Sequence, residues 1–299
     1  MKKILTIGPL FIILAALLWS ADGLLRVSLY TLPPTVVVFW EHILGVIILM
    51  PFILPKLKEL KNLRRKEWIS MILVGIFSGA LGTIFYTAAL GKVNFIQFSV
   101  VALLQQLQPI WAILTAAILL KEKISKNFVK WAALAIIASY FVTFKDMRVN
   151  LTSGMGTVIA AGLALAAGMM WAMSTSFSKV VLNKVSHSIA TLLRFVIAPA
   201  FIFILLFSTN KIPSLTQIDQ KQWLTLLIIT LSTGLVAQLI YYFGLKKTPA
   251  RVAAICELTW PASAIFIDYF YFHKGLSPTQ IIGVLVLVTA IRKVTKYRK

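Results

Sequence analysis

The sequence is poor in cysteine and in acidic residues. Cys256 is the only cysteine among 299 residues, which excludes an intrachain disulfide and a cysteine-based metal site. Asp and Glu number 9 against 30 Lys and Arg, so the formal net charge is +21. A nucleotide-binding P-loop, a nucleophile elbow and histidines at metal-ligand spacing are also missing. We therefore predict no catalytic residue, no metal, no cofactor and no ATP-driven transport by this chain alone.

Charged residues of both signs are scarce as well. They make up 13% of the chain, against about 25% in soluble domains. Hydrophobic residues make up 59%, and the mean hydropathy is +0.88. The basic residues lie in short gaps between apolar runs, where they are typical of cytoplasmic loop anchors. This pattern favours a membrane protein and argues against a nucleic-acid partner.

Ten apolar runs are long enough to approach or exceed the ~20 residues that cross a bilayer as a helix. They predict an all-α integral membrane protein with ten transmembrane helices in contact with the lipid bilayer. If the N-terminus is cytoplasmic, the inner segments hold about 22 Lys and Arg and the outer segments about 6. This bias predicts a multi-pass protein of the cell (inner) membrane with both termini in the cytoplasm. The runs lie near 7–29, 34–54, 68–90, 93–120, 127–144, 154–178, 188–208, 221–245, 250–272 and 279–295.

The chain also repeats itself. Trp19 is matched by Trp171 and Pro109 by Pro261, each 152 residues later, and Tyr86 is matched by Tyr241, 155 residues later. We predict a first five-helix repeat over 1–146 and a second over 151–299. Because each repeat has an odd number of spans, the second must be inverted. Inverted repeats with a site between them are typical of secondary transporters that work by alternating access.

Three motifs carry a family resemblance. The segments Tyr86-Thr87-Ala88-Ala89-Leu90, Gln108-Pro109 and Lys121-Glu122-Lys123-Ile124-Ser125 resemble the EamA domain of the drug/metabolite transporter superfamily. The resemblance covers nearly the whole chain, twice. It implies ten helices, inverted repeats and transport of small organic solutes, often amino acids or related metabolites and frequently outward. The second copy has His273-Lys274 where the family usually has Gly-Glu, and Glu41 stands where an arginine is common.

Charged residues inside predicted spans are costly and often functional. We predict that Glu41, Glu257 and Arg194 line a central cavity. The carboxylates would bind a substrate ammonium group, and Arg194 would bind a carboxylate. Glu41 or His42 could carry a coupling proton, because a desolvated carboxyl or an imidazole can titrate near neutral pH. The alternative is structural pairing, of Arg194 with Glu257 and of Arg26 with Glu41 or Asp22.

Other candidate substrate-binding residues are polar or aromatic. Gln105 corresponds to Glu257 in the repeat, and each lies four residues before a proline. Trp19, Trp171 and Trp260 could bind an aromatic ring or a cation. The alternatives are interhelical hydrogen bonding for the glutamine and simple packing for the tryptophans.

The sequence therefore favours a secondary transporter, and by resemblance an exporter, of small metabolites. Amino acids or related zwitterions are the expected substrates. Organic cations or amines are the alternative within transport. A non-transporting scaffold or receptor is the alternative from another class, although the short loops and the missing soluble domain argue against it.

Overall fold

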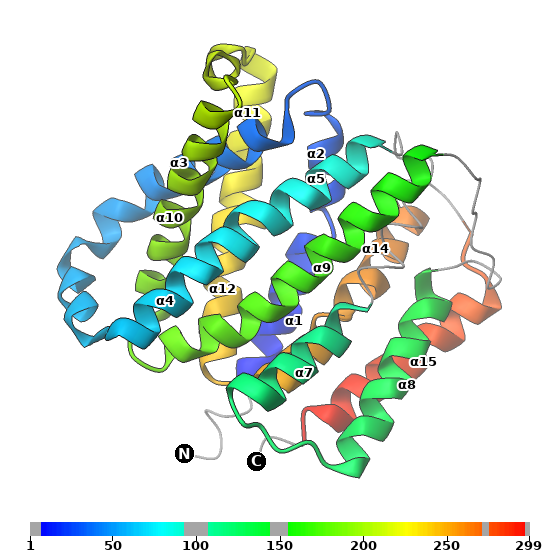
Figure 1. Ribbon diagram of the computed structural model, residues 1–299. Coiled ribbons are helices and arrows are strands. Elements are labelled where there is room, and N and C mark those ends of the chain that lie inside the picture. Colours follow the sequence, from blue (N-terminus) through cyan, green and yellow to red (C-terminus); the bar gives the residue numbers. More distant parts are fainter. Residues whose placement is uncertain (1–6, 93–106, 144–154, 271–274, 297–299) are drawn as a thin grey trace.

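The computed structural model describes residues 7–92, 107–143, 155–270 and 275–296, and every regular element in these ranges is helical (Figure 1). The first half forms α1 (Ile7–Trp19), α2 (Asp22–Val27), α3 (Pro34–Ile53), η2 (Leu54–Asn62), α4 (Arg65–Val74), η3 (Gly75–Gly82), α5 (Thr83–Lys92), α7 (Gln108–Leu119) and α8 (Lys126–Thr143). The second half forms α9 (Met155–Leu182), α10 (His187–Ser208), η5 (Ile212–Thr216), α11 (Gln220–Ile229), η6 (Thr230–Gly234), α12 (Leu235–Lys246), α13 (Ala250–Cys256), α14 (Thr259–Phe270) and α15 (Pro278–Val294). Within the described residues, the continuous apolar runs form helices, as predicted, whereas residues 93–106 of the predicted run 93–120 lie outside them.

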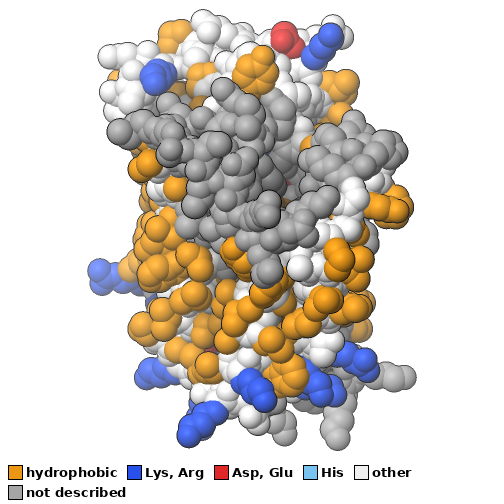
Figure 2. Space-filling model, turned by 90° about the vertical axis from the view of Figure 1, so that its right-hand side faces the viewer, with side chains coloured by type: hydrophobic (Ala, Val, Ile, Leu, Met, Phe, Trp, Pro, Cys, Tyr) orange, Lys and Arg blue, Asp and Glu red, His pale blue; other side chains and the backbone are white. Residues whose placement is uncertain are grey.

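Six segments of the described chain are long and apolar enough to cross a membrane. Figure 2 shows apolar side chains in a broad belt, with Lys and Arg gathered at the lower end of the molecule. α1 begins and α15 ends near that same lower end (Figure 1). An all-helical multi-pass membrane protein is therefore confirmed, while the count of ten spans stays a prediction. The six segments are Ile7–Arg26, Pro34–Asn62, Arg65–Gly91, Val158–Leu182, His187–Ser208 and Gln220–Lys246.

Equivalent helices of the two repeats pack in a reciprocal pattern. The first helix of each repeat lies against the third helix of the other, as α1 against α12 and α9 against α5. The second and fifth helices pack against their own counterparts, as α3 with α10 and α8 with α15, and α7 of the fourth run in the first repeat packs against α13 of the fourth run in the second. The interface between the repeats is therefore the core of the protein and not a secondary contact.

The third helix of each repeat contains one π-helical segment, and the two segments lie at equivalent places. η3 contains Gly79 and η6 contains Gly234, 155 residues later. A Cβ on Gly79 would lie 2.7 Å from the Cβ of Ala198, and one on Gly234 would lie 2.9 Å from Oε1 of Glu41. Both distances are too short for a side chain at these positions. The two glycines therefore allow α10 to approach η3 closely and α3 to approach η6 closely. Single π-helical turns often mark functional sites, and both segments reach the cavity described next.

Candidate functional site

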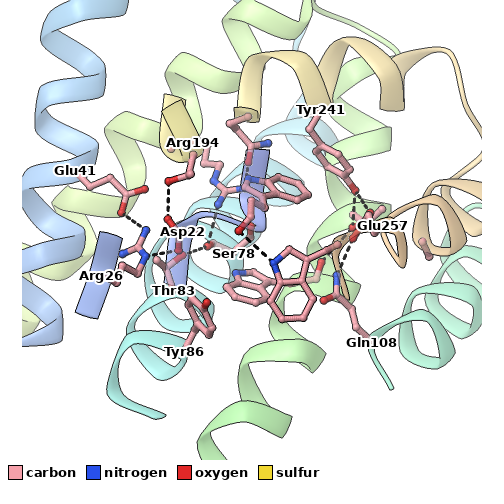
Figure 3. Close-up of a pocket in the computed structure, with 18 of the residues that line it drawn as sticks. Asp22, Arg26, Glu41, Ser78, Thr83, Tyr86, Gln108, Arg194, Tyr241 and Glu257 are labelled. Carbon is pink, nitrogen blue, oxygen red and sulfur yellow. Dashed lines mark hydrogen bonds and ion pairs between the residues drawn. The ribbon is translucent and has the colours of Figure 1, made fainter. Parts of the chain in front are cut away.

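A cavity lies between the two repeats (Figure 3). Its volume is about 170 Å³, room for on the order of ten water molecules. Charged and polar side chains line two sides of it, and aromatic side chains contribute further wall. The described lining residues that the following paragraphs use are Trp19, Asp22, Arg26, Glu41, His42, Ser78, Tyr86, Gln108, Trp171, Thr175, Arg194, Phe195, Thr233, Gln238, Tyr241, Glu257 and Trp260.

One side of the cavity holds a buried ion cluster. Nε of Arg26 lies 2.5 Å from Oδ2 of Asp22, one helical turn earlier, and its Nη2 lies 2.8 Å from Oε2 of Glu41. The hydroxyl of Thr233 in η6 donates to Oδ1 of Asp22 at 2.6 Å. The predicted pairing of Arg26 with Asp22 and Glu41 is thus confirmed. One guanidinium serves two carboxylates, so Glu41 is held by the protein itself.

The other side is built around Glu257, at the break between α13 and α14 (Figure 3). The hydroxyl of Tyr241 donates to its Oε1 at 2.6 Å, and Nε2 of Gln108 donates to its Oε2 at 2.9 Å. The chain turns at Glu257 and Leu258 before a new helix starts at Thr259. Discontinuous helices of this kind build substrate and ion sites in transporters.

Arg194 does not pair with Glu257, so that predicted alternative is wrong. Its Nη1 donates to Oε1 of Gln238 at 2.8 Å, and its Nη2 donates to the backbone carbonyl of Ser78 in η3 at 3.1 Å. The depth of a residue in the membrane is readable from its sequence position, whereas its direction around the helix axis decides its partner. Arg194 and Glu257 lie at similar predicted depths but bind different neighbours.

His42 is buried beside Arg194 and packs against Phe195, with ring centroids 4.6 Å apart. Its Nδ1 lies 2.8 Å from the carbonyl of Val38, one turn earlier, and because a carbonyl only accepts, Nδ1 carries the hydrogen. Within the described residues, Nε2 of His42 has no hydrogen-bond partner. His42 therefore contributes an oriented, enclosed imidazole to the cavity wall.

Two tryptophan–tyrosine pairs contribute aromatic walls. Trp19 packs against Tyr241 with ring centroids 5.1 Å apart, and Trp171 packs against Tyr86 with centroids 5.4 Å apart. Trp19 and Tyr86 belong to the first repeat, so each pair joins the first helix of one repeat to the third helix of the other. Trp260 contributes a third indole, whose Nε1 donates to the backbone carbonyl of Trp19 at 3.2 Å. Aromatic faces at equivalent places in both repeats suit a flat ring system.

The structure places most of the predicted site residues in one cavity. These are Trp19, Glu41, His42, Trp171, Arg194, Glu257 and Trp260. Gln105 lies outside the described residues, and the glutamine that contacts Glu257 is Gln108. That these residues bind substrate stays a prediction.

Sequence reasoning missed Tyr241 and Gln238 as cavity residues. Tyr241 had a usable signal, since it is the repeat counterpart of Tyr86 in the Tyr-x-x-Ala-Leu motif. Gln238 lies three residues before it, and a glutamine inside an apolar span is itself a sign of a polar partner. Both residues belong to α12, one turn apart on the face that meets α9 and α10.

A multi-pass helical protein with two equivalent halves around a polar and aromatic cavity has the architecture of many transporters. The model of the EamA-like transporter family matches residues 6–144 and 158–295. The chain therefore belongs to the EamA-like transporter family, within the drug/metabolite transporter superfamily, and it is a transporter and not an enzyme. The two matches confirm the repeated organisation that the sequence predicted.

Named relatives agree with this assignment. The chain is 35% identical to the riboflavin transporter ImpX of Fusobacterium nucleatum, over 97% of each chain. It is 24% identical to an uncharacterized transporter of Clostridium kluyveri, over 96% of this chain and 91% of that one. One solved crystal structure, 17% identical, superposes with a TM-score of 0.75 over 98% of this chain and 99% of the other, which shows the shared fold.

Proposed function

We propose that the protein is a secondary transporter that carries a flat, uncharged aromatic solute of the riboflavin type through the central cavity. The observation that carries the proposal is the two tryptophan–tyrosine pairs in the cavity wall, each of which joins a tryptophan of one repeat to a tyrosine of the other. A flavin ring offers a broad π-face together with an edge of carbonyl and ring-nitrogen groups. Stacking on the indoles would hold the face, and Nε2 of Gln238, which has no hydrogen-bond partner within the described residues, would donate to the edge. The named riboflavin transporter among the relatives supports this choice.

Ion pairs within the cavity limit the sites that are open to a charged solute. Glu41 and Asp22 already share Arg26, and Arg194 is already bonded to Gln238 and Ser78. The ammonium group of a zwitterion would have to displace Arg26 before it could bind Asp22 or Glu41, which leaves Glu257 as the carboxylate open to it in the described chain. Transport of amino acids, the alternative of organic cations and the outward direction therefore stay predictions, and the flavin-like solute is the better match to the geometry.

The volume of the cavity supports alternating access. Small-molecule sites commonly measure ~300–1,000 Å³, whereas this cavity measures about 170 Å³. A ring system of the proposed kind therefore requires the cavity to widen. Because helices from both repeats form the wall, widening means that one repeat moves against the other.

The proposal is tested by replacing a wall residue. We expect Trp171→Ala to weaken riboflavin binding about tenfold, because loss of a stacking aromatic costs roughly 1–3 kcal/mol. Quenching of flavin fluorescence by purified protein measures the binding, and uptake into proteoliposomes measures the transport. Trp131→Ala is the matched control, since Trp131 packs in the core beneath Lys293 and does not line the cavity. Equal riboflavin affinity in wild type and Trp171→Ala would contradict the proposal.

We further propose ten spans in two inverted repeats, with both termini in the cytoplasm of a protein in the cell membrane. The gathering of Lys and Arg at one end, where α1 begins and α15 ends, supports this orientation (Figures 1 and 2). Lys184 follows α9 near this end, and Lys221 lies in the first turn of α11 at the opposite end.

The orientation is tested by labelling single introduced cysteines in intact cells. A membrane-impermeant maleimide should react with Lys221→Cys and spare Lys184→Cys until the cells are opened. Both positions are exposed, and Cys256 is buried, so the background is low. The reverse labelling pattern would place the termini outside.

A further inference from the structure

We propose that Glu257 is the proton-binding group that couples transport to a pH gradient, an inference that rests on the proposed transport function. Of the carboxylates that line the cavity in the described chain, Asp22 and Glu41 lie within 4 Å of a cation and Glu257 does not. A carboxylate already balanced by Arg26 loses a strong ion pair on protonation. Glu257 loses no such pair, so a proton can bind and leave at a smaller cost.

Both protonation states of Glu257 find hydrogen-bond partners. The ionised form accepts from Tyr241 and Gln108. In the protonated form, the new O–H donates to Oη of Tyr241, and the hydroxyl of Tyr241 turns to donate to Oγ1 of Thr175, 3.2 Å away. Thr175 in turn donates to the backbone carbonyl of Trp171 at 3.2 Å. The only net change is one proton, which comes from cavity water on one side of the membrane and returns to water on the other.

The place of Glu257 in the fold links protonation to movement. Gln108 belongs to the first repeat and Tyr241 to the second, so the carboxylate bridges the two parts that must move. Hydrogen bonds to an ionised group are roughly twice as strong as those between neutral groups. Protonation therefore weakens the bridge between α7 and α13. Tyr241 also packs on Trp19, so the same event reaches the aromatic wall.

The surroundings of Glu257 fit a proton better than a metal cation. Within the described residues, the two hydrogen-bond contacts to its carboxylate are donors, and its backbone carbonyl accepts from the N–H of Trp260 at 2.9 Å. A hard cation would need several free oxygen ligands. Glu41 and His42, the sequence-based candidates for this role, are held by Arg26 and by the Val38 carbonyl.

Other titratable groups lie farther from this carboxylate. Tyr241 of α12 is the titratable side chain hydrogen-bonded to Glu257 in the described residues. Around the start of α13, Glu122 after α7 binds Arg251 of α13, and Lys179 of α9 binds carbonyls at the end of α12. α1 contributes no titratable side chain. The remaining charged or titratable groups of the cavity wall are Asp22, Arg26, Glu41, His42, Tyr86 and Arg194.

The first experiment needs no substrate. Infrared difference spectra of purified protein in lipid, recorded across a pH titration, should show a protonated-carboxyl band that Glu257→Gln removes. Glu257→Asp should retain the band at a shifted position. Glu67→Gln is the matched control and should leave the band in place, since Glu67 is a buried carboxylate outside the cavity that caps the backbone N–H of Arg64. A spectrum unchanged by Glu257→Gln would overturn the proposal.

The second experiment tests coupling in proteoliposomes with the membrane potential clamped. One proton per uncharged solute predicts about tenfold riboflavin accumulation per pH unit of gradient, since each tenfold ratio equals ~1.4 kcal/mol. We expect Glu257→Gln to abolish this accumulation. Accumulation driven by sodium, or wild-type flux insensitive to the pH gradient, would overturn the proposal. If riboflavin is not moved at all, the proposed substrate fails, and the infrared titration still decides whether Glu257 binds the proton.

Discussion

Replacing Arg26 by Gln should destabilise the protein more than any other single change in the cavity. Arg26 is the cation for both Asp22 and Glu41, and all three residues are buried. Its loss leaves two carboxylates close together without a counter-charge. Removing one partner of a buried ion pair commonly costs ~3–5 kcal/mol. We therefore expect a large fall in the unfolding midpoint and in the yield of monodisperse protein, measured by fluorescence-detected size-exclusion chromatography after heating.

Two further variants make the Arg26 result specific. Arg65→Gln removes an exposed arginine from the start of α4 and should leave the midpoint unchanged. Neutralising both acids together with the arginine, as Asp22→Asn, Arg26→Gln and Glu41→Gln, should recover much of the lost stability, since no buried charge then remains in the cluster. Wild-type stability in Arg26→Gln alone would show that the acids are neutral or solvated.

The second large effect is expected from Glu122→Ala. Oε1 of Glu122 accepts the backbone N–H of Ala250 at 2.8 Å, and Oε2 accepts from the N–H and from Nη1 of Arg251 at 3.2 and 2.9 Å. The side chain thus fastens the end of α7 to the first turn of α13. Its removal takes the carboxylate from a buried arginine, so we expect ~3 kcal/mol or more of lost stability.

Lys123→Ala is the matched control for Glu122→Ala, because Lys123 lies next to it in the same loop and is exposed. Thermal unfolding of both purified variants, followed side by side with wild type, measures the effect. Equal midpoints for Glu122→Ala and Lys123→Ala would mean that solvent or neighbouring groups replace the lost contacts.

The sequence predicted the parts of the fold that depend on one helix at a time. Apolar run lengths located the helices, and the matched positions Trp19 and Trp171 located the repeat. The pairing of Asp22 with Arg26 was also within reach, because residues four apart share a helix face. The EamA-like motif around Tyr86 then identified the family.

Features that depend on two helices at once were beyond the sequence. Membrane depth placed Arg194 and Glu257 together, yet the direction of each side chain sends them to Gln238 and to Tyr241. Neither π-helical segment was predicted, because a locally wider helix leaves the apolar run unchanged. Trp19 packs on Tyr241 and not on Tyr86 because the first helix of each repeat packs against the third helix of the other repeat.

That packing has a consequence for how such a protein could have arisen. Each aromatic pair takes its tryptophan from one repeat and its tyrosine from the other, so a single five-helix chain would hold only half of each pair. An ancestral half-length gene could have had a complete cavity only if two copies of its product assembled. On the proposed inverted arrangement, those copies would have had to insert into the membrane in opposite orientations. Fusion into one chain would then have let the two copies diverge. Glu41 and Arg194 could then differ at equivalent positions of the two repeats, and the proposed proton site could be present once, where symmetry would have required two.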